Sequence, residues 1–204
     1  MDEGYIKYQA EHEQTNNFKL SQNYVFLAQE LIKTRDYLHS LGLIGVYSNG
    51  IGFGNCSFRT KENEFVITGS ATGEIKNMSL CHLCIVKNFD INKNKVYSKG
   101  AISASSESMT HGAVYSAQSA ANCVLHIHSK KMFDFMKTNN HNFTEQSILY
   151  GTPAMAKAVM GEVKKINSPY GIIVMLGHEE GVISFGEDIS SALAQITSVY
   201  ELSC

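Results

Sequence analysis

The sequence predicts an α/β protein in which helices cover a central, largely antiparallel sheet. Three observations favour this class. Glycine-broken, β-rich runs fill residues 45–98, helical patterns precede and follow them, and two apolar strands around a polar break occupy residues 170–187. No linker, repeat or low-complexity segment divides the chain. We therefore expect one α/β domain over residues 21–204, after an N-terminal arm of residues 1–20.

In the first half of the chain, the pattern changes once from helical spacing of apolar residues to short β-rich runs. Apolar residues recur at helical spacing in residues 21–41, where Ser21 is a candidate N-cap and Gly42 a candidate stop. From Gly45 to about Ser98 the runs are short and β-rich, and "FDINKNKVYS" reads as a hairpin with its turn around Asn92 to Asn94. A helix followed by several strands is the expected order.

The second half alternates helices and strands. "SSESMTHGAVYSAQSA" predicts a helix capped by Ser105 or Ser106, followed by the strand "VLHIHS" and a polar connection over residues 139–145. Thr152 and Pro153 fit the N-cap and first turn of the next helix, because proline's missing N–H is not needed there. After the two apolar strands, a last helix is expected over about residues 189–202.

Composition argues against two classes of partner. The net charge of -2 offers no basic surface for a phosphate backbone, so we expect no nucleic-acid partner. Nowhere do 18 apolar residues run together, and the polar, acidic start has no signal segment, so we expect a cytoplasmic protein without membrane contact.

The five cysteines are an odd number, which fits free thiols. Cys81 and Cys84 form a single C-x-x-C, whereas a zinc ribbon needs two such pairs. Because "HLCIV" reads as a strand, we interpret them as half-buried strand cysteines.

The strand "VLHIHS" carries two ionisable rings. Successive side chains of a strand point to opposite faces, so His126 and His128 share a face with Val124, while Leu125 and Ile127 face the other way. Two converging imidazoles suit a metal ion, although hydrogen-bonded strand histidines show the same pattern.

A third histidine lies in the polar break "MLGHEEGVI". His178 stands between Gly177 and Gly181, which allow close backbone approach, so it is either a third ligand or a hairpin-tip histidine in water. Glu179 and Glu180 are either solvated or hydrogen-bonded to a ligating imidazole.

Glu107 falls in the first turn of the helix that "SSES" begins. The helix dipole alone favours an acidic residue there. The serines before it, with the loops "GFGNCS" and "TGSATG", offer hydroxyls and backbone N–H groups to an anion, although each loop by itself also fits an ordinary turn.

Taken in order, six motifs form a specific set: "GFGNCSFR", "FVITGSATG", "SSESMTHGAVY", "VLHIHS", "YGTPAMAK" and "LGHEEGVISFG". The set resembles the class II aldolase/adducin family over about residues 21–202. The resemblance implies a class II aldolase-like α/β/α domain with a central antiparallel sheet, assembled as a homotetramer with active sites at subunit boundaries.

The resemblance also implies roles for residues. Zn²⁺, or another divalent ion such as Mn²⁺ or Co²⁺, would be held by His126, His128 and His178, and Glu107 would act as the catalytic acid/base. The phosphate of a small phosphorylated sugar would be bound by Asn55, Ser70, Thr72, Gly73, Ser105 and Ser106.

Several activities fit this pattern. The leading expectation is a zinc-dependent aldolase-type lyase that acts on a phosphorylated ketose through a metal-stabilised enediolate. The same site in relatives serves a methylthioribulose-1-phosphate dehydratase and a ribulose-phosphate 4-epimerase. A non-catalytic, adducin-like module is the competing class, but such modules have lost the histidines that this chain keeps.

Overall fold

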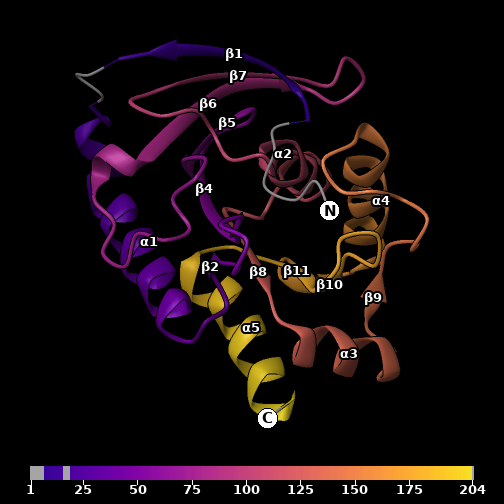
Figure 1. Ribbon diagram of the computed structural model, residues 1–204. Coiled ribbons are helices and arrows are strands. Elements are labelled where there is room, and N and C mark those ends of the chain that lie inside the picture. The colour runs from indigo at the N-terminus through magenta and orange to yellow at the C-terminus, as the bar shows by residue number, and fades with distance from the viewer. Residues whose placement is uncertain (1–6, 16–18, 204) are drawn as a thin grey trace.

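The computed structural model describes residues 7–15 and 19–203. Strands dominate residues 45–100, and helices alternate with single strands or a strand pair from residue 108 onward (Figure 1). In chain order the elements are β1 (Gln9–Gln14), α1 (Gln22–Ser40), β2 (Gly45–Val46), β3 (Gly52–Phe53), β4 (Asn55–Lys61), β5 (Glu64–Thr68), the 3-10 helix η1 (Leu80–His82), β6 (Leu83–Asp90), β7 (Lys95–Gly100), α2 (Ser108–Ala117), β8 (Cys123–His128), α3 (Lys130–Thr138), β9 (Asn142–Phe143), α4 (Pro153–Lys165), β10 (Gly171–Val174), β11 (Gly181–Gly186) and α5 (Ile189–Ser203).

One large sheet organises the described part of the chain, with the strand order β1-β7-β6-β5-β4-β8-β11-β10-β9. The outermost strands, β1 and β9, pair in parallel with β7 and β10, whereas every other neighbouring pair in the order is antiparallel. The short strands β2 and β3 form a separate antiparallel pair. The predicted, largely antiparallel sheet is confirmed.

Helices cover both faces of the sheet (Figure 1). Residues of α1, α3 and α5 share one hydrophobic core, which receives Leu125 and Ile127 of β8. Residues of α2 and α4 share a second core on the other face, which receives Val124. The two cores confirm the α/β/α layers, and the split within β8 follows from the alternation of strand side chains.

Several expected element ends are confirmed. Thr152 is the N-cap of α4, where its hydroxyl accepts a 3.2 Å hydrogen bond from the Met155 N–H, and Pro153 is the first helical residue. The β6–β7 turn contains Asn94 at a φ of 51°. Ser21 precedes α1, although its side chain makes no capping hydrogen bond, and α5 begins at Ile189.

The start of α2 differs from the sequence expectation. The helix begins at Ser108 with Glu107 at the N-cap position, so the prediction of Ser105 or Ser106 as the cap is wrong. The reason is a preceding turn, in which the Ser105 carbonyl oxygen accepts two hydrogen bonds from Ser108. The Ser108 N–H donates at 3.0 Å and the Ser108 hydroxyl at 2.6 Å.

Helix α3 is not anticipated by the sequence analysis. Ser129 caps it by accepting a hydrogen bond from the Met132 N–H at 3.3 Å. Met132, Phe133 and Met136 are its buried face, and the remaining residues include several lysines. A helix of nine residues carries too few periodic positions to be distinguished from the polar connection that follows it.

The four described cysteines are free. Cys84 is buried in β6. The interpretation of Cys81 as a strand residue is wrong, because it is exposed on the 3-10 helix η1 that precedes β6.

Part of the residue 1–20 segment contributes to the sheet as β1. The Tyr8 hydroxyl beside it is buried and donates to the carbonyl oxygens of Ala104 and Ser105, both at 3.1 Å. Residues 1–6 and 16–18 lie outside the described chain, and the division into an arm and a domain at residue 20 stays a prediction.

Candidate active site

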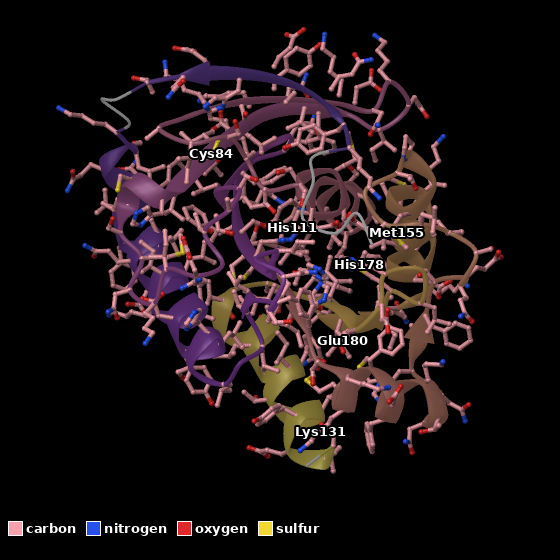
Figure 2. The ribbon with its side chains drawn as sticks, viewed as in Figure 1. Cys84, His111, Lys131, Met155, His178 and Glu180 are labelled. Atoms are coloured by element: carbon pink, nitrogen blue, oxygen red, sulfur yellow. The ribbon has the colours of Figure 1, made fainter. Side chains whose placement is uncertain are left out.

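Three buried histidines meet at the centre of the sheet. His126 lies on β8, paired with Asn55 of β4 and Ile183 of β11, and His128 ends the same strand. His178 lies in the turn between β10 and β11, which ends beside His128 (Figure 2). One candidate ligand nitrogen from each ring lies within 4.8 Å of the others, so the three could hold a metal ion.

Hydrogen bonds orient the first of these rings. His126 Nδ1 lies 3.1 Å from the Val182 carbonyl oxygen. A carbonyl only accepts hydrogen bonds, so Nδ1 carries the proton and Nε2 presents a lone pair. That Nε2 is 3.1 Å from His128 Nε2.

Electrostatics keep the rings of His126 and His128 neutral. Burial, with repulsion from His178, lowers the pKa of His126 and of His128 well below the ordinary histidine value. Neutral imidazole is the form that binds a divalent ion, so the buried site favours the required protonation state.

Glu107, at the N-cap of α2, lies beside the three histidines. Its side chain is 3% exposed, and the Thr110 hydroxyl donates to Oε2 at 2.7 Å. Oε1 is buried and has no hydrogen-bond partner among the described residues. Glu107, the three histidines and Tyr150 line a space of about 20 Å³, which is enough for one water or ion.

A larger cavity of about 240 Å³ adjoins this space. Its wall is made by residues 50–55, residues 69–73, Ser105 and Ser106, and the segment 52–55 together with Ser106 also lines the smaller space. The residues that the sequence marks as a phosphate site therefore lie around one cavity: Asn55, Ser70, Thr72, Gly73, Ser105 and Ser106.

The loop of residues 69–73 has a constrained shape. Ala71 has a φ of 57°, in the left-handed region that non-glycine residues rarely adopt. A side chain at Gly73 would place its Cβ 2.2 Å from the Gly45 carbonyl oxygen, so only glycine fits. The Thr72 hydroxyl donates to the Gly69 carbonyl oxygen at 2.9 Å.

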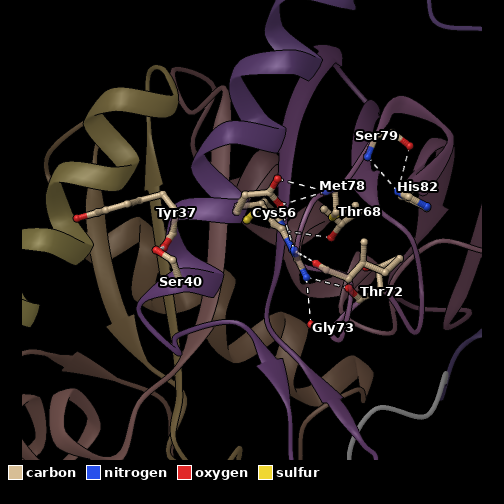
Figure 3. Close-up of polar contacts among 12 residues, drawn as sticks. Tyr37, Ser40, Cys56, Thr68, Thr72, Gly73, Met78, Ser79 and His82 are labelled. Atoms are coloured by element: carbon tan, nitrogen blue, oxygen red, sulfur yellow. Dashed lines mark hydrogen bonds and ion pairs between the residues drawn. The ribbon is translucent and has the colours of Figure 1, made fainter.

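A buried arginine of α1 supports this loop, whose residues Thr72 and Gly73 are labelled in Figure 3. Arg35 is 1% exposed and donates to the carbonyl oxygens of Thr72 at 2.8 Å, Gly73 at 3.1 Å and Ile75. The Asp36 carboxylate accepts a hydrogen bond from the Met78 N–H at 3.2 Å. The two residues tie the loop and the segment after it to the helix.

Sequence reasoning missed four side chains at the site. Tyr150 stacks on His178 at 4.4 Å between ring centroids, and Tyr47 contacts His128 Nδ1 through its hydroxyl at 2.8 Å. Both lie in loops, where no periodicity marks them. Phe53 lines both cavities. His111 lies one helical turn after Glu107, and among the four residues only this spacing could have been recognised in the sequence.

His111 is fully buried beneath the site (Figure 2). Its Nδ1 lies 2.6 Å from the Ser57 hydroxyl, which in turn lies 2.7 Å from the Tyr115 hydroxyl. Burial lowers the pKa of His111 to about 3, so the ring is neutral at physiological pH.

None of the helices in residues 7–15 and 19–203 combines the length and apolarity needed to cross a membrane.

Comparison with known proteins gives a consistent result. The family model described as "Class II Aldolase and Adducin N-terminal domain" matches residues 29–203. No curated protein sequence matches the chain.

Solved structures share the fold at low identity. A sugar-phosphate aldolase from Thermotoga maritima is 13% identical with a TM-score of 0.68, covering 89% of this chain and 93% of its own. YgbL from Klebsiella pneumoniae is 16% identical with a TM-score of 0.67, covering 91% and 89%. L-fuculose-1-phosphate aldolase from Thermus thermophilus is 18% identical with a TM-score of 0.62, covering 87% and 90%.

Proposed function

The chain belongs to the class II aldolase and adducin family, and we propose that it is a metal-dependent, aldolase-type lyase acting on a small phosphorylated ketose. The observation that carries this proposal is the juxtaposition of two spaces. Three buried histidines and Glu107 line the smaller one, and glycine-rich loops and serines line the larger one beside it. A reactive centre next to an anion pocket fits a phosphorylated substrate.

The chain's own residues fit a divalent ion. His126, His128 and His178 would hold it, and Zn²⁺, Mn²⁺ or Co²⁺ all accept imidazole ligands. Two observations support a cation in this space: the short approach of His126 Nε2 to His128 Nε2, and a Glu107 Oε1 that no described residue hydrogen-bonds. When bound, such an ion supplies Lewis acidity to a substrate carbonyl.

Glu107 is the proposed acid/base. Its Oε1 has no hydrogen-bond partner in residues 7–15 and 19–203, and is therefore available to take a proton from a substrate carbon and to return it. The Thr110 hydroxyl holds the other oxygen, Oε2, and fixes the direction of the carboxylate.

The larger cavity is the proposed phosphate site. Its described lining contains hydroxyl and amide side chains and glycine backbone, with no lysine or arginine. Asn55, Ser70, Ser105 and Ser106 would donate from side chains, and the backbone at Thr72 and Gly73 would approach the phosphate oxygens. A phosphate anchored there would orient the reacting carbons toward Glu107.

Other chemistries would use the same residues. A methylthioribulose-1-phosphate dehydratase and a ribulose-phosphate 4-epimerase need the same metal ligands and the same proton-transfer group. An adducin-like module without catalysis would need neither. The presence of all three histidines and Glu107 favours an enzyme.

Assembly and location are part of the same proposal. We infer a homotetramer with active sites at subunit boundaries, located in the cytoplasm. Light scattering coupled to size-exclusion chromatography would show a mass about four times the 22.5 kDa chain, whereas a monomer would contradict the assembly.

A screen of phosphorylated ketoses tests the function. Zinc-loaded protein is incubated with each compound, and aldehyde release, water loss and epimer formation are scored separately, with Glu107→Gln as the matched inactive variant. Aldehyde release that depends on Glu107 would support the lyase. Water loss or epimer formation alone would replace it with one of the alternatives, and no turnover of any compound would favour the module.

A further inference from the structure

A hydrogen-bonded chain connects a carboxylate near the molecular surface to one of the candidate metal ligands. The Tyr47 hydroxyl donates to Glu180 Oε2 at 3.1 Å and lies 2.8 Å from His128 Nδ1. Glu180 is partly exposed, whereas His128 is buried. The chain therefore runs from the rim of the site to its interior.

The direction of the protons along this chain follows from the donors available. A carboxylate only accepts hydrogen bonds, so the single Tyr47 hydroxyl proton points to Glu180. The Tyr47 oxygen can then only accept from His128, which requires a proton on Nδ1. His128 Nε2 is left with a lone pair.

At the inner end of these hydrogen bonds, two ring nitrogens with lone pairs face each other. His126 Nε2 is also unprotonated, since its Nδ1 donates to the Val182 carbonyl. The two Nε2 atoms are 3.1 Å apart. Two acceptors at this separation repel each other unless a proton or a cation lies between them, so this arrangement of hydrogen bonds is suited to a metal-loaded site.

Local structure holds Tyr47 and Glu180 in place. The Tyr47 N–H donates to the Ile51 carbonyl at 2.8 Å, and the Tyr47 ring packs on Phe53 at 4.4 Å. Glu180 has a φ of 63°, a conformation costly for a non-glycine residue, and its carbonyl accepts from the Ser129 N–H at 3.0 Å. Ser129 directly follows His128, so the Glu180 backbone and the ligand strand are joined.

We propose that Tyr47 and Glu180 are positioning residues for the metal ligand His128. Glu180 orients the Tyr47 hydroxyl, and that hydroxyl keeps the proton of His128 on Nδ1, so that Nε2 is presented to the metal. The carboxylate also places negative charge behind the ligand His128. The inference rests on the metal site of the proposed function but not on the reaction catalysed there.

Metal affinity in single and double variants tests the proposal. Zinc dissociation constants of the full-length chain are measured by competition with a chromogenic chelator. The variants are Tyr47→Phe, which keeps the ring and removes the hydroxyl, Glu180→Gln, and the two combined. Glu179→Gln is the matched control, because the neighbouring carboxylate is exposed. Near-ultraviolet circular dichroism checks that each variant is folded.

Tyr47→Phe should weaken zinc binding by about tenfold to a hundredfold, and Glu180→Gln by a smaller factor. The double variant should match Tyr47→Phe alone, because Glu180 acts through Tyr47, and Glu179→Gln should match the wild type. In the zinc-loaded wild type, histidine ¹⁵N chemical shifts should show the His128 proton on Nδ1.

Three results would overturn the inference: equal zinc affinity in Tyr47→Phe and wild type, independent effects of the two substitutions, or a His128 proton on Nε2. A wild-type chain that binds zinc but turns over no ketose would remove the proposed function and leave the inference standing. A wild-type chain that binds no divalent ion would overturn both.

Discussion

Arg35 Nη2 donates a 2.8 Å hydrogen bond to the carbonyl oxygen of Thr72, and so helix α1 holds the loop that lines the larger cavity. The same guanidinium reaches the carbonyl oxygens of Gly73 and Ile75. Because these bonds use backbone carbonyls, they turn the loop's carbonyls away from the cavity and toward α1. The Thr72 hydroxyl and the N–H groups of Gly69 and Ser70 donate within the protein, so the Ser70 hydroxyl and the N–H groups of residues 71–73 are the donors that we expect an anion to use.

Replacing Arg35 should therefore weaken anion binding. In Arg35→Met the three carbonyl groups lose their buried donor, and the free energy of unfolding should fall by about 2–4 kcal/mol. Inorganic phosphate, titrated by calorimetry, should bind about tenfold more weakly, and zinc affinity should stay within about twofold of wild type. Lys33→Met, on the exposed face of the same helix, is the control. Unchanged phosphate binding in a folded Arg35→Met protein would show that the loop does not need this support.

Glu107→Gln separates metal binding from proton transfer. The amide keeps the size of the side chain and the acceptor for Thr110, so zinc affinity should change little. Turnover of the active ketose should fall by about 10²- to 10⁴-fold, because an amide cannot take the proton. Glu187→Gln, at an exposed position, should behave as wild type. Full activity of Glu107→Gln would remove Glu107 from the mechanism.

Acid should destabilise the metal-free protein through its buried histidines. The pKa of His111 is about 3 in the folded chain and near 6.5 when unfolded, so only the unfolded state binds its proton between these values. Stability is therefore retained above about pH 6.5 and lost as the pH falls toward 3, by about 1.4 kcal/mol per pH unit for this group. His126 and His128 shift in the same direction.

His111→Gln provides the comparison. Its free energy of unfolding, from urea denaturation at several pH values, should fall less steeply below pH 6 than that of wild type, by about one proton. Above pH 7 the two curves should run parallel. Equal slopes below pH 6 would mean that the folded protein accommodates a charged His111.

A glycine in the β10–β11 turn fixes the position of His178. A Cβ on Gly177 would lie 1.7 Å from the Ile148 carbonyl oxygen, so Gly177→Ala must displace the turn. We expect zinc affinity to fall by about tenfold or more. Gly161→Ala is the matched control, because nothing lies within 4 Å of its Cβ in α4, and it should stabilise the protein by about 0.5–1 kcal/mol. Equal zinc affinity in the two variants would show that the turn adapts.

The regular parts of the fold are predictable because they repeat a local signal. Alternation in β8 places Leu125 and Ile127 in one core and the histidines on the other face, and Thr152 with Pro153 marks the start of α4. The expectation for α2 is wrong by a few residues, because Ser105 has capping chemistry but is used in a turn. Local chemistry does not reveal which of two hydrogen-bonded alternatives the tertiary structure selects.

The candidate site likewise contains residues that the sequence predicts and residues that it does not. His126, His128 and Glu107 lie on elements with a readable period, and His178 is marked by its flanking glycines. Tyr47, Tyr150 and Arg35 act through contacts with residues far along the chain, at separations that no local pattern encodes. A buried arginine on an amphipathic helix is the clearest case, because sequence alone places such a charge on the solvent side.

Metal content tests the central claim most directly. Protein expressed with zinc and dialysed without chelator is analysed by inductively coupled plasma mass spectrometry, together with His126→Ala, His128→Ala and the control His39→Ala, whose ring lies on α1 and is not one of the three candidate ligands. The account predicts about one divalent ion per wild-type or His39→Ala chain and less than about a tenth of an ion in the other two. A wild-type chain with less than about a tenth of an ion, or site variants that keep the full amount, would contradict it.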